Sequence, residues 1–238
     1  MTNRVLLNNV DHAALTIMPQ FGDAFGHRTN SVRVFPTEYT EVAREYPILF
    51  RRDEETNQMF ALVLLGLDRD ENLFLSGEGW NARYIPAVYA RGPFSIGVQP
   101  ESDGRPADAL IHVDLDDPRV GSGGYPVFLP KGGNAPILER VSDVLRTITT
   151  GIEIEPAMFA AFTAENLIQP VQLKIEIDAT RRYDLVGFLT IDATALASLD
   201  GEALGRLHRA GFLGPAFAVA ASLGNINALI EMKNRAGA

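Results

Sequence analysis

Residues 46–94 decide the fold. They contain three apolar segments, YPILF (46–50), MFALVLLGL (59–67) and LFL (73–75), separated by short polar turns. Apolar segments of this length with turns between them predict an antiparallel meander of three strands. The unbroken apolar character of residues 59–67 predicts burial on both faces and a central place in the sheet.

Shorter elements are expected on either side of this meander. Strands are predicted within residues 5–17 and over 31–35, 94–98, 109–115, 127–129, 171–177 and 184–191, the last two forming a hairpin. Helices are predicted over 37–45, 135–150, 155–167, 194–199, 202–210 and 215–233. Gly151 is expected to separate two of these helices, and Pro47 to follow the end of another. The expected fold class is therefore α+β, a mainly antiparallel sheet with helices gathered in the C-terminal third, as one domain over residues 1–238.

Composition excludes several classes of site. The chain has 238 residues and no cysteine, which excludes disulfides, zinc–thiolate sites, iron–sulfur clusters and thiol nucleophiles. A net charge of −9 without a cluster of basic residues argues against binding to nucleic acid. The N-terminal residues lack the apolar core of a secretory signal, and no run of 18 apolar residues exists, so we expect a cytoplasmic chain with no membrane span.

Aromatic and arginine side chains gather in one part of the sequence, which makes it the candidate binding surface. The set consists of Tyr46, Trp80, Arg83, Tyr84, Tyr89, Arg91 and Phe94, with Trp80 the only tryptophan of the chain. Aromatic side chains interleaved with arginine are typical of binding hot spots. The competing interpretation is that Trp80 and Tyr84 only cover the central strand, because aromatic side chains usually serve packing first.

A metal site is a weaker alternative. Non-haem Fe(II) oxygenases hold iron with two histidines and one carboxylate. His112 and Asp114 flank Val113 on an expected strand, so both side chains face the same side, and His208 follows later in the chain. This set would indicate an Fe(II)/2-oxoglutarate-type oxygenase. The competing interpretation, that these are edge-strand or surface residues, leads us to expect no metal and no cofactor. Glycine-rich phosphate loops and the GxSxG serine motif are absent from the sequence.

The segment PAFAVAASL (215–223) is almost entirely apolar around its circumference. Such a helix is either buried or docked against another chain. We therefore predict a homodimer formed through this C-terminal helix, with Phe217, Val219 and Leu223 at the contact.

The order of several pieces resembles the bacterial SapC-like family. These pieces are NNVDHAAL near the start, YPILF (46–50), the LGL of 65–67, GWNARYIPAVYARGPF (79–94), and the late GFLTIDATALASLDGEALGRLHRAGFL before a long helix. The resemblance covers about residues 8–230. It implies an accessory role, because members tend to be encoded near tryptophan-halogenase-like proteins, cupin-like oxygenases and TonB-dependent receptors. It implies no catalytic residues.

The expected function follows from this resemblance and from the aromatic surface. We expect a non-catalytic accessory or binding protein, linked to nutrient uptake or to peptide or tryptophan modification, with a protein, a peptide or a small molecule as its partner. The oxygenase above is one alternative. The family name, which comes from a surface-layer locus, implies another, a surface-layer-associated structural protein.

Overall fold

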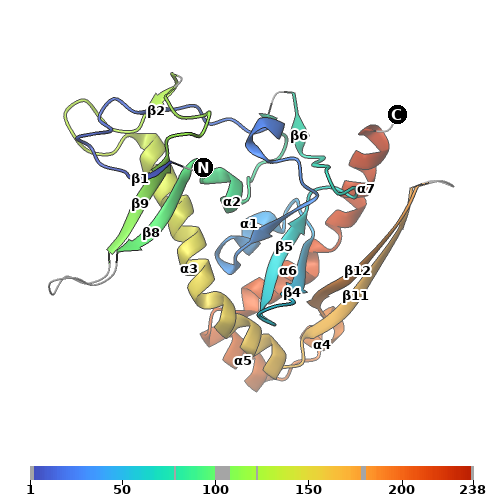
Figure 1. Cartoon of the computed structure of the whole chain (residues 1–238). Helices are drawn as coiled ribbons and strands as arrows, with labels where there is room; N and C mark the ends of the chain where they lie inside the picture. The colour runs from blue at the N-terminus through green and yellow to red at the C-terminus, as the bar shows by residue number, and fades with distance from the viewer. Residues whose placement is uncertain (1–2, 78, 100–107, 122, 178–180, 237–238) are drawn as a thin grey trace. The chain divides into compact units, whose positions relative to one another are not determined.

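The computed structural model describes residues 3–77, 79–99, 108–121, 123–177 and 181–236 (Figure 1). Its antiparallel sheets and its helices, most of which lie in the C-terminal part, confirm the α+β class. The chain divides into two compact units. Unit 1 consists of Met1–Phe21 and Ala87–Ile148, and unit 2 of Gly22–Pro86 and Thr149–Ala238. The single domain expected over residues 1–238 stays a prediction.

Unit 1 is built on a three-stranded antiparallel sheet in the order β1-β9-β8 and a two-stranded sheet of β2 and β10. The strands are β1 (Arg4–Leu6), β2 (Thr16–Ile17), β8 (Phe94–Gln99), β9 (Asp108–Asp114) and β10 (Tyr125–Pro126). The short helix α2 (Ala87–Ala90) and the first part of α3 (Pro136–Ala164) complete the unit. The strand expected over residues 127–129 is wrong: the strand found there is β10, which ends at Pro126, and Phe128 forms only an isolated bridge with Asn134.

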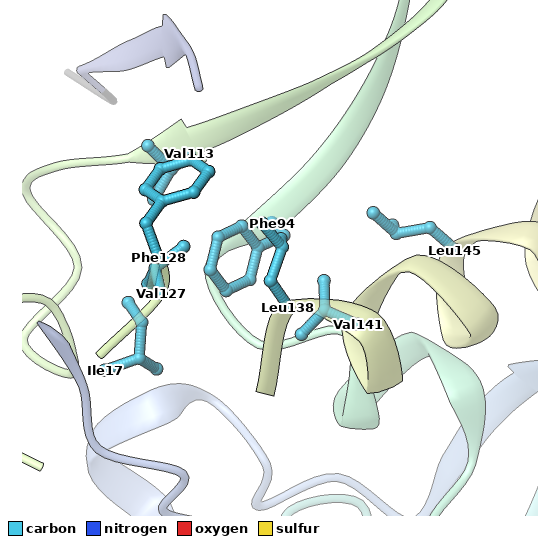
Figure 2. Close-up of a cluster of buried hydrophobic side chains, with 8 residues drawn as sticks. All are labelled: Ile17, Phe94, Val113, Val127, Phe128, Leu138, Val141 and Leu145. Carbon is cyan, nitrogen blue, oxygen red and sulfur yellow. The ribbon is translucent and has the colours of Figure 1, made fainter. Parts of the chain in front are cut away.

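The core of unit 1 joins this sheet to the first turns of α3 (Figure 2). Phe94 and Val113 are register partners on β8 and β9, and both are buried. Leu138, Val141 and Leu145 lie at the three- and four-residue spacing that places side chains on one face of a helix. The apolar pattern of residues 135–150 thus marks the helix face that packs against the sheet.

Unit 2 contains a five-stranded antiparallel sheet in the order β11-β12-β4-β5-β3. The strands are β3 (Ser31–Val34), β4 (Ile48–Arg52), β5 (Met59–Leu64), β11 (Ile168–Glu176) and β12 (Arg182–Ile191). Strand β5 pairs with β4 on one side and β3 on the other, so it lies inside the sheet, next to the edge strand β3 and not at the centre.

The prediction that residues 73–75 form the third strand of a meander is wrong. Strand β6 (Leu75–Ser76) leaves the sheet and pairs with β7 (Gly79–Trp80). The chain turns away because Asn72 fixes its direction: the side-chain amide donates to the carbonyl of His27 at 2.9 Å, and the side-chain oxygen accepts from the amide of Phe74 at 3.0 Å. A buried side chain with two such bonds sets the path of the residues that follow it.

Helices surround the sheet of unit 2. They are η1 (Asp23–Phe25), η2 (Pro36–Glu38), α1 (Tyr39–Val42), the later part of α3, α4 (Ala193–Ala197), α5 (Gly201–Arg209), α6 (Leu213–Ser222) and α7 (Asn225–Ala236). Helix α6 contacts β4 and β12. Its buried Ser222 hydroxyl accepts the amide of Ile48 at 2.9 Å, so the helix also satisfies a backbone donor of the sheet.

Two helix boundaries differ from expectation. Helix α3 continues through Gly151 and Pro156 and ends only where Asn166 adopts a left-handed φ of 53°, with the amide of Leu167 bonded to the carbonyl of Phe162 at 2.9 Å. This left-handed turn is a common way to end a helix. The helix expected over residues 215–233 is instead two helices, because Asn225 turns its side-chain amide to the carbonyls of Ala43 and Tyr46, at 2.8 Å and 3.1 Å.

The C-terminal helices bear on two further expectations. By length and composition alone, Leu213–Ala236 is long and apolar enough to cross a membrane: its mean hydropathy is 1.5, and 22% of its most apolar 18-residue stretch is buried. One such segment is weak evidence, so the absence of a membrane span stays a prediction.

Of the residues expected at a dimer contact, Val219 is buried inside unit 2, Leu223 is half-buried and Phe217 is 52% exposed. The homodimer likewise stays a prediction.

A buried carboxylate links α3 to β3 and makes the stability of unit 2 depend on pH. Glu155 is bonded to Arg33 at 2.5 Å through Oε2, while its Oε1 is buried without a partner among the described residues. Burial raises the pKa of Glu155 above its ordinary value, although Arg33 and a backbone hydrogen bond at Ala61 act in the opposite direction. The folded state therefore holds a proton on Glu155 more tightly than the unfolded state does.

A first prediction follows for the variant Glu155→Gln. A raised folded pKa contributes stability that is fully present below the unfolded pKa, about 4.3, and is lost as pH rises through the folded pKa. We therefore expect the Tm of the parent protein, relative to that of Glu155→Gln, to rise as pH is lowered from 7.5 to 5. Thermal melts of both proteins across this range measure the difference. A difference that falls on acidification would contradict the raised pKa.

Candidate functional site

Three aromatic residues predicted from the sequence are joined in unit 2 by hydrogen bonds. The buried hydroxyl of Tyr46 accepts the indole N–H of Trp80 at 2.8 Å and donates to the carbonyl of Tyr84 at 2.6 Å. The ring of Phe74 lies 4.5 Å from that of Tyr46 and 6.4 Å from that of Trp80, centroid to centroid. Burial raises the pKa of Tyr46, which outweighs the opposite effect of its hydrogen bond with Trp80, so the phenol stays neutral and keeps its donor.

Two glutamates hold the same segment, residues 79–84, which we call the aromatic loop. Glu38, 2% exposed, accepts the hydroxyl of Tyr84 at 2.8 Å and the amide of Phe35 at 3.1 Å. The carboxylate of Glu45 accepts the amides of Arg83 and Tyr84 at 3.0 to 3.2 Å. Burial, and then the charge of Glu38, raise the pKa of Tyr84. The aromatic loop is therefore fixed from both sides by charge-assisted bonds.

The remaining members of the predicted surface belong to unit 1. Phe94 is a core residue of that unit, 1% exposed, and Tyr89 and Arg91 are half-buried. Arg91 donates to the carbonyl of Phe94 at 2.6 Å. Burial lowers the pKa of Arg91, and the nearby charges of Arg4 and Arg119 lower it further. The structure thus brings Tyr46, Trp80, Arg83 and Tyr84 together in unit 2 and assigns the other three residues to unit 1.

A groove of about 560 Å³ lies beside the aromatic loop, within unit 2. Its walls include Arg44, Glu45, Phe74, Asn81, Met232 and Arg235. A smaller hollow of about 260 Å³ shares Arg44 and Glu45 with it and adds Glu41, Arg83 and Tyr84. The aromatic loop thus packs on Tyr46 and Phe74 and also borders open space.

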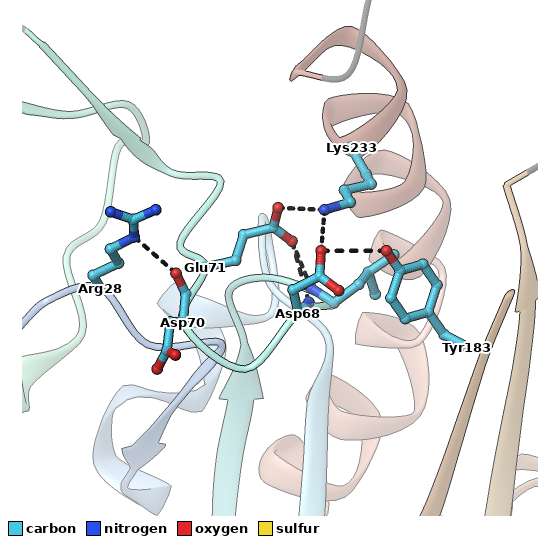
Figure 3. A network of polar contacts seen from close by, with 7 residues as sticks. Arg28, Asp68, Asp70, Glu71, Tyr183 and Lys233 are labelled. Atoms are coloured by element: carbon cyan, nitrogen blue, oxygen red, sulfur yellow. Dashed lines mark hydrogen bonds and ion pairs between the residues drawn. The ribbon is translucent and has the colours of Figure 1, made fainter. Parts of the chain in front are cut away.

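Helix α7 supplies the second wall of the groove, and a polar network anchors this helix (Figure 3). The ammonium of Lys233, a side chain only 11% exposed, lies 2.5 Å from both Asp68 Oδ2 and Glu71 Oε1. Asp68 also accepts the hydroxyl of Tyr183 on β12 at 3.3 Å. Burial lowers the pKa of Lys233, but its hydrogen bonds to Asp68 and Glu71 outweigh this effect and raise it above the ordinary value.

Sequence reasoning missed the α7 side of the groove. Met232 and Arg235 are far from the aromatic loop in the chain, and an arginine near the end of a helix carries no signal of binding by itself. The usable signal was Gly224-Asn225, a glycine and an asparagine that interrupt an apolar helix and so mark a turn. Such a turn is what brings α7 back toward Ala43 and Tyr46.

The three residues of the iron alternative belong to different units of the chain. His112 and Asp114 are on β9 in unit 1, whereas His208 is on α5 in unit 2. Asp114 accepts the amides of Asn3 and Asp116. Within the described ranges, no three His, Asp or Glu side chains gather as a metal-binding group. The oxygenase therefore receives no support from the geometry.

Comparison with known proteins identifies the family of the chain. The model of the SapC family matches residues 7–229, nearly the whole chain. The chain belongs to the SapC family. The SapC match contains the aromatic loop and the residues that hold it, whereas Met232 and Arg235 lie beyond its end. No curated protein and no solved structure matches the chain.

A second prediction concerns the hydroxyl at the centre of this site. Tyr46→Phe leaves the indole N–H of Trp80 and the carbonyl of Tyr84 without their partner, so we expect a loss of about 1–2 kcal/mol in the free energy of unfolding. We also expect acrylamide to quench Trp80 more strongly, because the aromatic loop loosens. Urea unfolding followed by circular dichroism measures the first effect. The matched control is Tyr183→Phe, which removes only the 3.3 Å bond to Asp68 and is expected to change little. Equal effects of the two variants would contradict this role for Tyr46.

Proposed function

We propose that this SapC-family chain is a non-catalytic binding protein whose ligand occupies the groove between the aromatic loop and α7. The observation that carries the proposal is that both walls are held by buried or half-buried polar contacts, from Tyr46, Glu38 and Glu45 on one side and from Lys233 on the other. A site whose walls are already ordered loses less conformational entropy when a ligand binds.

The chemistry of the lining supports binding rather than catalysis. The carboxylate of Glu45 already accepts the backbone amides of Arg83 and Tyr84, so it serves to hold the aromatic loop. The volume of about 560 Å³ lies within the range of small-molecule sites, roughly 300–1,000 Å³, and suits a small molecule or a few residues of a peptide. We infer an accessory role, linked to nutrient uptake or to peptide or tryptophan modification, in which the chain holds a molecule that other proteins use.

We also propose that the protein acts in the cytoplasm without a cofactor. Fractionation of cells that express the tagged chain tests the location. Recovery from the membrane fraction would contradict the proposal and would direct attention to residues 213–236 as a membrane-associated segment.

Fluorescence tests the proposed groove, because Trp80 is the only tryptophan and stacks on Phe74, which lines it. The probes are tryptophan, a set of tripeptides, medium-chain fatty acids, and Fe(II) with 2-oxoglutarate. We expect one class of probe to shift the emission or reduce acrylamide quenching, and titration calorimetry to confirm its binding.

A pair of variants on α7 locates the response. Ala228→Phe fills the groove and should abolish the response, whereas Asn227→Phe, on an exposed neighbouring residue that does not line the groove, should retain it. Equal responses of the two variants would place the ligand elsewhere. No response and no heat with any probe in the parent protein would contradict the proposed function.

A further inference from the structure

The charge of the groove differs in sign from that of the whole chain. Among the described residues, the charged side chains that line the groove and the adjoining hollow are three arginines, Arg44, Arg83 and Arg235, and two glutamates, Glu41 and Glu45. The lining therefore carries one net positive charge, although the chain carries −9. When charges of one sign are in excess in a concave site, they raise the local concentration of ions of the opposite charge.

The carboxylates of the lining are already occupied. Glu41 pairs with Arg44 at 2.9 Å, and Glu45 binds the amides of Arg83 and Tyr84. Among the described residues, the guanidinium of Arg83 has no ion pair, and that of Arg235 reaches only the carbonyl of Glu231 at 3.4 Å. Donors that face open space in this way remain available to an anion from outside.

The rest of the lining is apolar or amide. Leu73, Phe74, Ala228 and Met232 form the apolar part. Methionine adapts its shape to apolar groups of different form, so it suits a site of this kind. Asn81 is exposed, and Asn225 spends its N–H groups on Ala43 and Tyr46, which leaves its side-chain oxygen as an acceptor.

We propose that the groove binds a monoanionic carboxylate carried on an apolar body. The carboxylate pairs with Arg235 and with the N–H groups of Arg44 that remain beside its bond to Glu41, which uses Nη1 alone. The planar guanidinium groups match the two oxygens of a carboxylate. The apolar body lies on Met232 and Phe74. A peptide C-terminus and a fatty acid share this chemistry, and the side-chain amide of Asn81 favours the peptide, because it bonds to backbone amides. This inference rests on the proposed function and adds the class of its ligand.

A carboxylate fits the lining better than a phosphate. One net positive charge balances a monoanion, and the partial negative charge at the C-terminal end of α7 opposes any anion, a dianionic phosphate more strongly than a carboxylate. We therefore expect inorganic phosphate neither to bind in the groove nor to compete with the ligand.

The test compares matched probes on the full chain. Tripeptides of Ala, Leu, Phe and Met are titrated with a free C-terminus and, in parallel, with a C-terminal amide, using Trp80 emission and calorimetry. Octanoate and octanamide form the second arm. We expect the free-carboxylate member of at least one arm to bind about 10-fold more tightly than its amide, with an affinity that falls as salt is raised. The arm that responds identifies the source of the carboxylate.

Variants assign the effect to the two arginines. Arg235→Ala and Arg44→Ala should each weaken binding of the free carboxylate about 10-fold while leaving binding of the amide unchanged. Arg209→Ala is the matched control, since Arg209 is an exposed arginine in the last turn of α5 and does not line the groove. If an amide binds as tightly as its carboxylate, or if Arg235→Ala binds like Arg209→Ala, the carboxylate inference is overturned while the binding function stands. If no member of either arm binds, the inference is overturned as well, and the remaining fluorescence probes decide the proposed function.

Discussion

Replacing Gly151 by alanine is expected to lower the free energy of unfolding by about 3 kcal/mol, although the same change inside an exposed helix normally raises it by about 1 kcal/mol. A Cβ atom on Gly151 would lie 2.4 Å from Cβ of Phe35 and 2.8 Å from Oγ1 of Thr37. Phe35 cannot yield easily, because it is 3% exposed and both its amide and its carbonyl are bonded to Glu38. The added methyl group must therefore move α3 away from the sheet of unit 2.

The control for this prediction is Gly205→Ala in α5. Its nearest neighbour would be Nη1 of Arg209 at 3.1 Å, the mobile end of a long side chain that can move aside. We expect this variant to gain up to about 1 kcal/mol from helix propensity alone. Urea unfolding of both variants, followed by circular dichroism, measures the contrast. A Gly151→Ala protein as stable as the parent would show that α3 does not pack as closely as described.

The second large effect is expected for Lys233→Met. The substitution keeps an apolar chain of similar length but leaves Asp68 and Glu71 facing one another without the ammonium group. Removing one partner of a buried ion pair costs about 3–5 kcal/mol. Because the side chain of Asp68 is 57% exposed and water screens part of its charge, we expect the free energy of unfolding to fall by about 3 kcal/mol, the lower end of that range. Arg182→Met removes an exposed pair with Glu176 and is expected to cost less than about 0.5 kcal/mol.

The pH dependence of Lys233 adds a further check. Because its folded pKa is raised, its contribution is fully present below the unfolded pKa of about 10.4 and is lost only as pH rises through the folded pKa. The difference in stability between the parent protein and Lys233→Met should therefore be the same at pH 7 and pH 9. A difference that shrinks over this interval would mean that the network in Figure 3 does not hold the ammonium group.

Local patterns in the sequence predicted much of the fold. The alternation of apolar and polar residues after Val171 predicted the hairpin, and the structure forms it as β11 and β12. The start of the helix predicted over residues 37–45 shows the limit of such patterns. The structure begins the turn at Pro36 instead, so Glu38 reaches back to the amide of Phe35. A shift of one residue in the start of a helix is beyond what residue types alone specify.

The site was harder to predict because its parts meet through tertiary contacts. The aromatic residues near Trp80 were visible as a group, but where each one packs depends on partners far away in the chain, as Tyr46 is for Trp80 and Glu38 for Tyr84. Helix α3 shows the same limit, since Gly151 is a helix breaker by propensity and is required by its contact with Phe35. Propensity describes a residue with its near neighbours, and these positions are set by residues far away in the chain.

The order of the units along the chain has a consequence for its synthesis. All residues of unit 1 have been made once Ile148 is added, whereas the sheet of unit 2 still lacks β12, which pairs with β4 through Leu189 and Phe50. At 5–20 residues per second, the ribosome needs on the order of 10 s to make the stretch of chain from Phe50 to Leu189. During that interval Ile48, Leu49 and Phe50 have left the ribosome without the strand and helices that finally cover them. A nascent chain stalled in this interval is therefore the form of the protein with the greatest need of a chaperone.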